Sequence, residues 1–499
     1  MKISIKTMKH IILMVALVLT ATTWSACSNE DELTTIEQPA QSKTFTVTTT
    51  LSPRTNGMRS TMTDNGDGSI STEWKVGDQI RVSYRNTSDN MVTTTAEVTA
   101  VNPSTKAATI TVTLTDPMNS GEIQFGYPIS YYEYSKDLFS DQIGTLADIS
   151  ANFAAIYGVV NMTVSGSVVT LPTVTMYPET CIWKFSFTDG ANDITSDITK
   201  LVIDVSDSDD HETYIVTPSS QSTIYVALQK FNNKSISITA QTSTGVYRKT
   251  AANITLASGK TYTSTGLALT SAAASNVVAG DVGSVIGADG NIYPRASVAT
   301  ACGTTGEAVI VYVGTVDKYF NHFLAIALAD AAYGVTWSAA LTAIGTYAGN
   351  HPITIGGTTY NNTNACISGY YDVVSDNNAT TSATATTLHQ GWRMPTVTDW
   401  RYLYAGIFGK SPTDPIGVNH GLEYSNSSSS GDDKSKILQV VSNKILKSYA
   451  VPGATIYNTW FSSEVTGNDG KAWDFEPDYC SFYYVEKTNT LNVVAVFAY

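Results

Sequence analysis

The sequence predicts a mainly β protein, with two tandem β-sandwich domains followed by a mixed α/β domain. Short segments in which apolar and polar residues alternate, such as 109–115 and 181–187, recur up to about residue 270 with turn residues between them. This pattern is typical of β-sandwiches. Charged residues make up only 14% of the chain and 28 residues are tyrosine, a composition typical of extracellular β proteins. Strong helix-like patterns begin only after residue 280, which indicates a different fold there.

The first 27 residues have the layout of a secretory signal peptide. Three lysines precede an apolar run at residues 11–19, and small residues follow up to Cys27. The sequence before Cys27 resembles a bacterial lipoprotein box, although Trp24 departs from the usual leucine. The resemblance implies that Cys27 is acylated and becomes the mature N-terminus; a plain signal peptide with an incidental cysteine is the alternative. The acidic run at residues 28–32 resembles a surface-export signal of Bacteroidales-type lipoproteins, and an acidic flexible linker would look the same.

A β-strand is expected near the mature N-terminus, at residues 43–51. Phe45, Val47 and Leu51 alternate there with threonines, which predicts a strand with one buried face.

The strand leads into a loop that contains two arginines. The chain breaks at Pro53 and then carries Arg54 and Arg59, where a trypsin-like protease could cut. Removal of the strand would leave an open sheet edge and an apolar groove that can accept a strand from another chain. The plainer alternative is an ordinary first strand followed by a surface loop.

Net charge and motifs exclude several classes of function. The net charge of -14 argues against partners such as nucleic acid and against adsorption to anionic lipid. The H-E-x-x-H, G-x-S-x-G and C-x-x-C motifs are absent from the sequence, so we expect no enzyme activity and no cofactor. The acidic turn at residues 64–68 lacks the later ligands of a calcium loop and predicts a hairpin rather than a metal site.

The cysteines beyond Cys27 leave one question open. One disulfide among Cys302, Cys366 and Cys480 is plausible in an exported protein, and its pairing cannot be deduced. Cys181 alternates with large apolar residues and is expected to be a buried strand cysteine.

The first half of the chain resembles the fimbrillin family of type V pili. The resemblance lies in the lipoprotein signal, the strand and arginine loop, the motif EWKVGDQIRV at 73–82, and the closing segment LASGKTYTSTGLALT at 256–270. It implies two β-sandwich domains, at 28–165 and 166–270. It also implies cleavage by an arginine-specific protease after Arg54 or Arg59, loss of strand 43–51, and polymerisation with other pilin subunits by strand exchange.

A small-residue linker at 271–279 precedes the third part of the chain, 280–499. Ala- and Leu-rich segments at 322–333 and 337–347 predict helices, although the first could contain another strand. Thr396 is expected to cap a helix that runs to about residue 408.

The order of YVG, LAIALADA, GWRMPTVTDW, TWFSSE with AWDF, and a terminal apolar strand resembles bacterial C-type-lectin-like domains with a W-R-x-P-T motif. The resemblance implies a mixed α/β domain whose first and last strands pair, and a role in binding glycans or proteins.

Candidate ligand-binding residues lie in the loops of this third part. The Glu476-Pro477-Asp478 sequence imitates a calcium-dependent sugar motif, but the tryptophan, asparagine and aspartate signature expected after it is missing. Tyr370, Tyr371 and Tyr424 are the better candidates for exposed contacts. Most of the tryptophans in this part are expected to pack in the core.

Together these features predict the tip subunit of a type V pilus with an adhesive C-terminal domain that binds a host or microbial ligand. Its strand at 491–499 is expected to be folded into that domain, so the chain could accept a donor strand but not donate one. The expected location is the outer membrane as a lipoprotein precursor and then the fimbrium, with the membrane contacted only through the lipid before processing. The alternatives are a lipid-anchored glycan-binding protein at the cell surface and a pilus anchor subunit.

Overall fold

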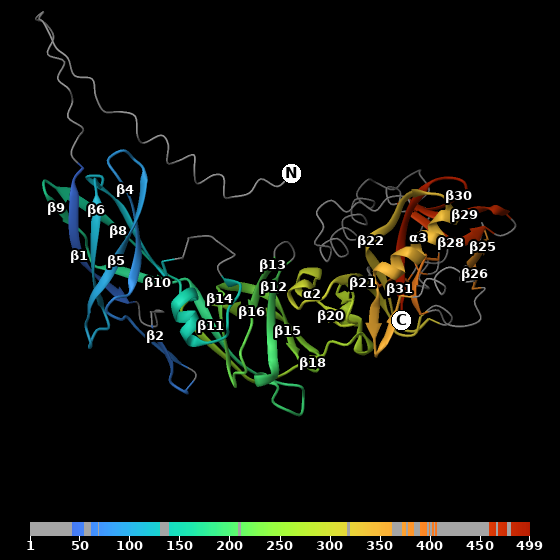
Figure 1. Cartoon of the computed structure of the whole chain (residues 1–499), viewed down its shortest axis with the longest axis horizontal. Helices are drawn as coiled ribbons and strands as arrows, with labels where there is room; N and C mark the ends of the chain where they lie inside the picture. The colour runs from blue at the N-terminus through green and yellow to red at the C-terminus, as the bar shows by residue number, and fades with distance from the viewer. Residues whose placement is uncertain are drawn as a thin grey trace, which may run out of the picture. The chain divides into compact units, whose positions relative to one another are not determined.

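The protein is mainly β in the part of the chain that the computed structural model describes (Figure 1). No helix of the described residues is long and apolar enough to cross a membrane. The described segments are 42–53, 61–67, 69–129, 139–207, 211–316, 320–361, 372–375, 378–383, 390–396, 459–465, 468–476 and 481–499, with residues 399, 402, 403, 405 and 406.

Within these segments, eight strands form the first sheet. They are β1 (Thr44–Pro53), β4 (Gln79–Arg85), β5 (Met91–Val101), β6 (Ala108–Thr115), β7 (Ser120–Tyr127), β8 (Ile156–Ser165), β9 (Val168–Thr170) and β10 (Val174–Pro178). Their order is β10-β1-β6-β5-β4-β7-β8-β9, and β10 also pairs with β8. The sheet therefore closes on itself around an apolar core.

The strands β9 and β10 correct one expectation, which placed residues 168–176 at the start of the second sandwich. In the structure β9 pairs with β8, and β10 pairs with β1 and β8. Val174 and Met176 alternate into the core of the first sheet, so these short strands complete the first sheet before the chain moves on. Only Glu179 separates β10 from the first strand of the next sheet.

The second sandwich consists of two sheets that contribute to the same apolar core. The described strands of one sheet are β14 (Ile224–Gln229), β11 (Thr180–Thr188) and β17 (Thr261–Ala268), in that order. The other sheet has the order β13 (His211–Val216), β12 (Ile198–Ser206), β15 (Phe231–Thr242), β16 (Val246–Leu256) and β18 (Thr270–Ser271). Phe185 and Phe187 stack in the core with ring centroids 5.2 Å apart. Aromatic stacking of this kind adds to the stabilisation that burial supplies.

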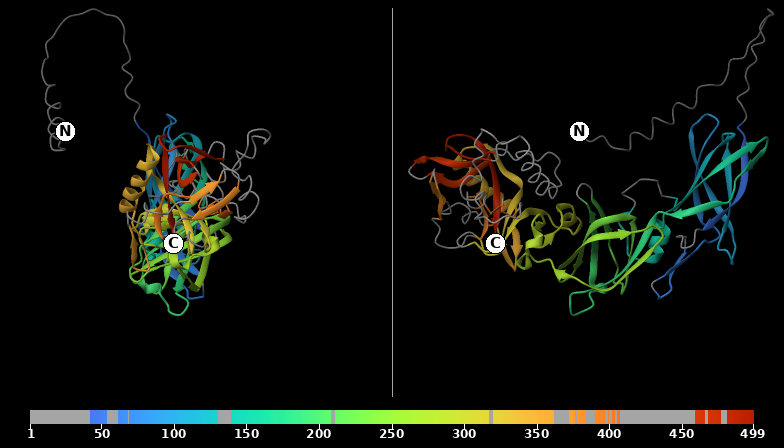
Figure 2. Two further views of the ribbon diagram at one scale, coloured as in Figure 1. Left: turned by 90° about the vertical axis from the view of Figure 1, so that its right-hand side faces the viewer. Right: turned by 180° about the vertical axis from the view of Figure 1, so that it is seen from behind.

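A third sheet of 11 described strands follows. Its main path is β20 (Ile292–Tyr293), β19 (Val285–Gly287), β21 (Gly306–Val313), β22 (Phe323–Val335), β31 (Leu491–Ala498), β28 (Thr459–Val465), β25 (Asp372–Ser375) and β26 (Asn378–Ala383). The strands β27 (Gly391–Arg393), β29 (Asn468–Glu476) and β30 (Ser481–Glu486) lie off this path. The helix α3 (Trp337–Asn350) contacts β22, β27 and β31, and Figure 2 shows this gold helix beside the sheet.

The other described elements are short. They are the hairpins of β2 (Thr61–Asp64) with β3 (Ile70–Glu73) and of β23 (Ile353–Ile355) with β24 (Thr358–Tyr360), the helices α1 (Leu146–Asp148) and α2 (Ala296–Ala301), and the single turns η3 (Ile149–Phe153), η4 (Thr195–Asp197), η5 (Ala274–Asn276) and η6 (Ala279–Asp281).

Of the two alternatives for residues 322–333, the helix is wrong and the strand is confirmed, because this segment lies in β22. Its Ala and Leu residues favour a helix in isolation, but β22 pairs with β21 on one side and β31 on the other. Ladder hydrogen bonds and burial on a central strand override that propensity. The helix expected at 337–347 is confirmed as α3.

Two further expectations for the third part need correction. The stretch 271–279 is packed rather than a bare linker, because Ala272 and Ala274 are fully buried. The expected pairing of the first and last strands is not found among the described residues: β19 pairs with β20 and β21, whereas β31 pairs with β22, β27 and β28.

Candidate strand-exchange site

The strand β1 lies between β6 and β10 in the first sheet, and Figure 1 shows the dark blue β1 beside β6. It pairs antiparallel with β6 along its length, from Thr44 opposite Thr115 to Leu51 opposite Ala108. Parallel pairing with β10 covers only Leu51, Ser52 and Pro53. The strand is therefore held on both edges at its C-terminal end and by β6 over the rest of its length.

The inner face of β1 consists of every second residue, as the alternation of the sequence predicts. Leu51 is fully buried, Val47 is 6% exposed, and Phe45 is half-buried against the same core. The β6 residues opposite this face are all buried; they are Leu114, Val112, Ile110 and Ala108. Burial of a Val or Leu side chain contributes about 1.5–3 kcal/mol, so these contacts alone hold the strand firmly.

Thr49 is a member of the inner face that the sequence analysis did not single out. It is 6% exposed, and its Oγ1 donates a hydrogen bond to the backbone oxygen of Pro172, 2.9 Å away. Pro172 lies in the connection between β9 and β10. The spacing of Thr49 from Phe45, Val47 and Leu51 could have placed it on this face. Side chains of a strand alternate with period two, and Thr49 lies two residues from both Val47 and Leu51.

The loop that would be cut lies between β1 and β2. Arg54 and Arg59 fall outside the described residues, but the elements on either side are described: β1 ends at Pro53 and β2 begins at Thr61. β2 pairs with β3 in a separate two-stranded sheet. A cut in this loop would therefore leave β1 attached to the first sheet by non-covalent contacts alone.

The hairpin after the loop is fixed at its turn. Asp64 accepts hydrogen bonds at Oδ2 from the Lys184 ammonium group and the Tyr225 hydroxyl, both at 2.5 Å. The bond from Lys184, followed by those from Tyr225 and the backbone of Gly66, lowers the pKa of Asp64 to about 2. Lys184 and Tyr225 belong to β11 and β14, so the hairpin is anchored on the second sandwich.

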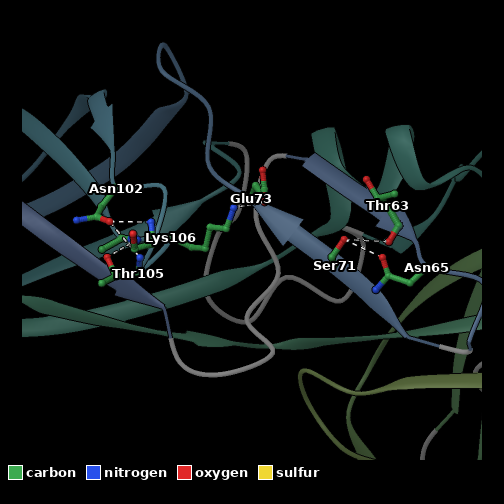
Figure 3. Close-up of polar contacts among 9 residues, drawn as sticks. Thr63, Asn65, Ser71, Glu73, Asn102, Thr105 and Lys106 are labelled. Atoms are coloured by element: carbon green, nitrogen blue, oxygen red, sulfur yellow. Dashed lines mark hydrogen bonds and ion pairs between the residues drawn. The ribbon is translucent and has the colours of Figure 1, made fainter.

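A second set of contacts holds the base of the same hairpin (Figure 3). The Lys106 ammonium group, in the turn between β5 and β6, lies 2.6 Å from the Glu73 carboxylate at the end of β3. Near the turn, the Ser71 hydroxyl donates to Asn65 Oδ1 at 3.2 Å. The expected hairpin at 64–68 is thus confirmed. Its position depends on contacts with Lys184, Tyr225 and Lys106, none of which belongs to β1.

The strand β31 is a central strand of the third sheet. Residues of β31 pair with a neighbouring strand on each edge. Ala498, for example, lies opposite Leu324 of β22 on one edge and Gly391 of β27 on the other. Every residue from Val493 to Ala498 is at most 5% exposed. β31 could be released to another molecule only by opening the apolar core of this sheet.

The W-R-x-P-T motif has a structural explanation. The Arg393 guanidinium group binds the Asp399 carboxylate at two points, Nη2 to Oδ1 at 2.6 Å and Nε to Oδ2 at 3.2 Å, and both side chains are at most 1% exposed. Thr396 Oγ1 accepts from the Asp399 backbone, and Asp399 Oδ2 accepts from the Thr396 backbone. This reciprocal pair is a capping box, which confirms Thr396 as an N-cap.

The tryptophan of this motif is also part of the core. Trp392 is 1% exposed and its Nε1 donates to the backbone oxygen of His351 at 2.7 Å. Its ring meets Tyr347 edge-on, with centroids 5.2 Å apart. Trp392 therefore presents no ring face to a ligand.

The expected ligand-binding residues lie almost entirely outside the described segments. This holds for Tyr370, Tyr371, Tyr424 and Asp478, and the lipidation residue Cys27 lies outside them as well. Glu476 is the last residue of β29, and only its backbone is described.

The described cysteines are buried free thiols. They are Cys181 and Cys302, and burial raises their pKa values to about 12 and about 11. Both remain protonated at neutral pH. Cys302 thus forms no disulfide in this structure, while Cys366 and Cys480 fall outside the described residues. Among the described side chains, no group of three His, Cys, Asp or Glu could hold a metal ion.

No family model matches the chain, and no curated protein matches it. The solved structures that match include candidate cell adhesion proteins from Parabacteroides distasonis, Bacteroides uniformis and Bacteroides eggerthii. They cover 46%, 45% and 46% of this chain and 94%, 96% and 84% of their own, at 7%, 10% and 9% identity and TM-scores of 0.24, 0.25 and 0.21. Likeness at these TM-scores does not assign the chain to a family, so its function has to be inferred from its own residues.

Proposed function

We propose that this chain is a structural and adhesive subunit of a cell-surface pilus, placed at the pilus tip. Proteolysis removes β1, and the first sheet then accepts a strand from another pilin subunit. The observation that carries the proposal is the place of β1: the first described strand of the chain fills a core position between β6 and β10, yet a single short loop joins it to the rest.

The topology makes β1 separable from the sheet that it completes. The remaining strands of that sheet, β4 to β10, all follow the loop in the chain. Cleavage at Arg54 or Arg59 and loss of β1 would leave them covalently intact, with the edge of β6 unpaired and the apolar side chains of Ile110, Val112 and Leu114 uncovered. An unpaired edge beside an apolar groove favours the addition of a strand.

The burial of β31 supports the tip position. A subunit within the shaft must both accept a strand and give one to its neighbour. Because β31 is paired on both edges and buried on both faces, it is a poor donor, and this chain could end a polymer without extending it.

The adhesive role belongs to the third part of the chain. We propose that this part binds a glycan or a protein receptor rather than catalysing a reaction. The candidate contact residues are Tyr370, Tyr371, Tyr424, Glu476 and Asp478. This part of the proposal rests on the sequence resemblance to lectin-like domains.

The test is the intact mass and the N-terminal sequence of the protein taken from the cell surface. A start at Thr55 or Ser60, without lipid, is expected. A lipidated start at Cys27 with β1 retained would refute the proposal. Immunogold labelling along the pilus shaft instead of at its end would refute the tip position alone.

A second function has one observation in its favour. β1 is an integral strand of its sheet, because it pairs with β6 from Thr44 to Leu51 and places Val47 and Leu51 in the core. A lipid-anchored surface protein that binds glycans, or a pilus anchor subunit, would keep both the lipid and β1. The same mass measurement separates these two from the tip pilin.

A further inference from the structure

The inner face of β1 is not uniformly apolar. The groove that β1 fills between β6 and β10 therefore favours a polar side chain at one position. Three of the four inward residues of β1 are apolar, but the third in order, Thr49, is polar and only 6% exposed. Its side chain faces the fully buried Ile110 across the ladder. A polar group in such surroundings needs a hydrogen-bond partner, and the groove supplies one in the backbone oxygen of Pro172.

The acceptor of this hydrogen bond belongs to the groove and not to β1. Pro172 lies between β9 and β10, so its oxygen stays in place when β1 leaves. A residue without a donor at this position, such as valine, would fill the same volume and leave the oxygen without that bond. The loss of one such hydrogen bond weakens binding by roughly threefold to tenfold.

The groove is also most demanding at its Leu51 end. There the strand lies between Ala108 of β6 and Val174 of β10, and Leu51 is fully buried. Towards the other end β10 no longer pairs with β1, and Phe45 is only half-buried. The residue in the place of Leu51 must therefore fit a closed space, whereas the residue in the place of Phe45 has more freedom.

We infer that the groove selects a partner strand that carries a serine or threonine in the place of Thr49 and a leucine-sized side chain two residues later. This inference rests on the proposed function, and it names the chemistry of the donor strand. The donor runs in the direction of β1, because only that direction keeps the antiparallel pairing with β6 and the parallel pairing with β10. β31 of a second copy is not the donor, because it is buried in its own sheet.

The test uses the full chain with residues 54–60 replaced by the recognition sequence of a sequence-specific protease. After the cut, a fluorescent peptide of residues 43–53 displaces the resident β1, and unlabelled variants of the peptide compete with it in an anisotropy assay. The design separates the groove from natural processing, because the native arginines are gone.

The matched pair of peptides is T49V and T48V. Both changes are isosteric, but Thr48 is exposed on the outer face, where its Oγ1 lies 3.4 Å from Thr111 Oγ1. We expect T49V to compete roughly threefold to tenfold less well than the native peptide, T49S to stay within about threefold, and T48V to be unchanged. L51A should lose at least about tenfold.

Each outcome decides a different claim. Equal competition by T49V and T48V would overturn the inference, and so would the absence of any exchange after the cut. Discrimination against T49V in the cut chain, together with retention of β1 on the cell surface, would support the selectivity of the groove and refute the proposed pilin function.

Discussion

The packing of Leu51 gives the sharpest quantitative prediction, through the substitution Leu51→Ala. Leu51 is fully buried, with Ala108 opposite it on β6 and Val174 on β10. Buried Leu→Ala substitutions cost 2–5 kcal/mol, and the larger values occur where the neighbours cannot collapse into the cavity. Because the backbone is paired on both edges at this point, we expect a loss of about 3 kcal/mol in the free energy of unfolding of the first sheet.

Two assays measure this loss. In the uncut chain, hydrogen exchange followed by mass spectrometry should show exchange of β1 and β6 amides faster by about two orders of magnitude, since 1.4 kcal/mol corresponds to tenfold. Calorimetry should show a melting temperature for the first sheet that is lower by roughly 10 °C.

The control for Leu51→Ala is Thr46→Ala. Thr46 lies on the outer face of the same strand and is exposed, so its substitution should change stability by less than about 0.5 kcal/mol. If the β1 and β6 amides of both variants exchange at the same rate, β1 is not packed into an apolar core. The argument that β1 fills a groove open to another strand would then fail.

Three further predictions concern buried or partly buried carboxylates. Asp399→Asn should destabilise the third part of the chain by about 3–5 kcal/mol, because it leaves the buried Arg393 without its counter-ion; a melting temperature equal to that of the native chain would contradict this. Asp330→Asn should stabilise the protein by about 1 kcal/mol at pH 7 after allowance for solvent screening. Burial raises the pKa of Asp330 to about 6, so the destabilising effect of its charge appears as pH rises from about 4 through 6. Urea titrations below pH 4 should therefore show no difference in stability between the variant and the native chain. Asp64→Asn should lower the free energy of unfolding by about 1 kcal/mol at pH 7. The bonds from Lys184 and Tyr225 lower the pKa of Asp64 to about 2, so the stability that its charge contributes is present above about pH 4 and lost as pH falls through 2. If the variant were less stable than the native chain by the same amount at pH 2 and at pH 7, charge would not be the cause.

The sequence was sufficient where local pattern and tertiary structure agree. The alternation of Phe45, Val47 and Leu51 predicted β1 and its buried face, and the acidic turn predicted the β2–β3 hairpin. Thr396 was predicted as an N-cap from its residue type, and the capping box with Asp399 explains why. In each case the signal lies within a few consecutive residues.

The sequence was insufficient where distant partners decide. The segment that forms β22 has the composition of a helix, and only its pairing with β21 and β31 makes it a strand. The assignment of β9 and β10 to the first sheet depends on β8 and β1, and the latter lies more than a hundred residues earlier. Lys184 and Tyr225 carry no motif that would pair them with Asp64.

The position of β1 also has a consequence for the order of folding. β1 is synthesised before any of its partners, yet its ladder requires β6, about 60 residues later, and β10, about 120 residues later. Pairings between such distant segments form slowly, because the entropy of closing the intervening loop must be overcome first. The first described strand is thus among the last that can pair completely. Until β10 is complete, the position between β6 and β10 is not fully formed. From then on β1, which is tethered to the sheet, is present near this position at a high effective concentration and fills it. If the first sheet accepts strands of other molecules, as proposed, the covalent tether would keep them out until the chain has finished folding.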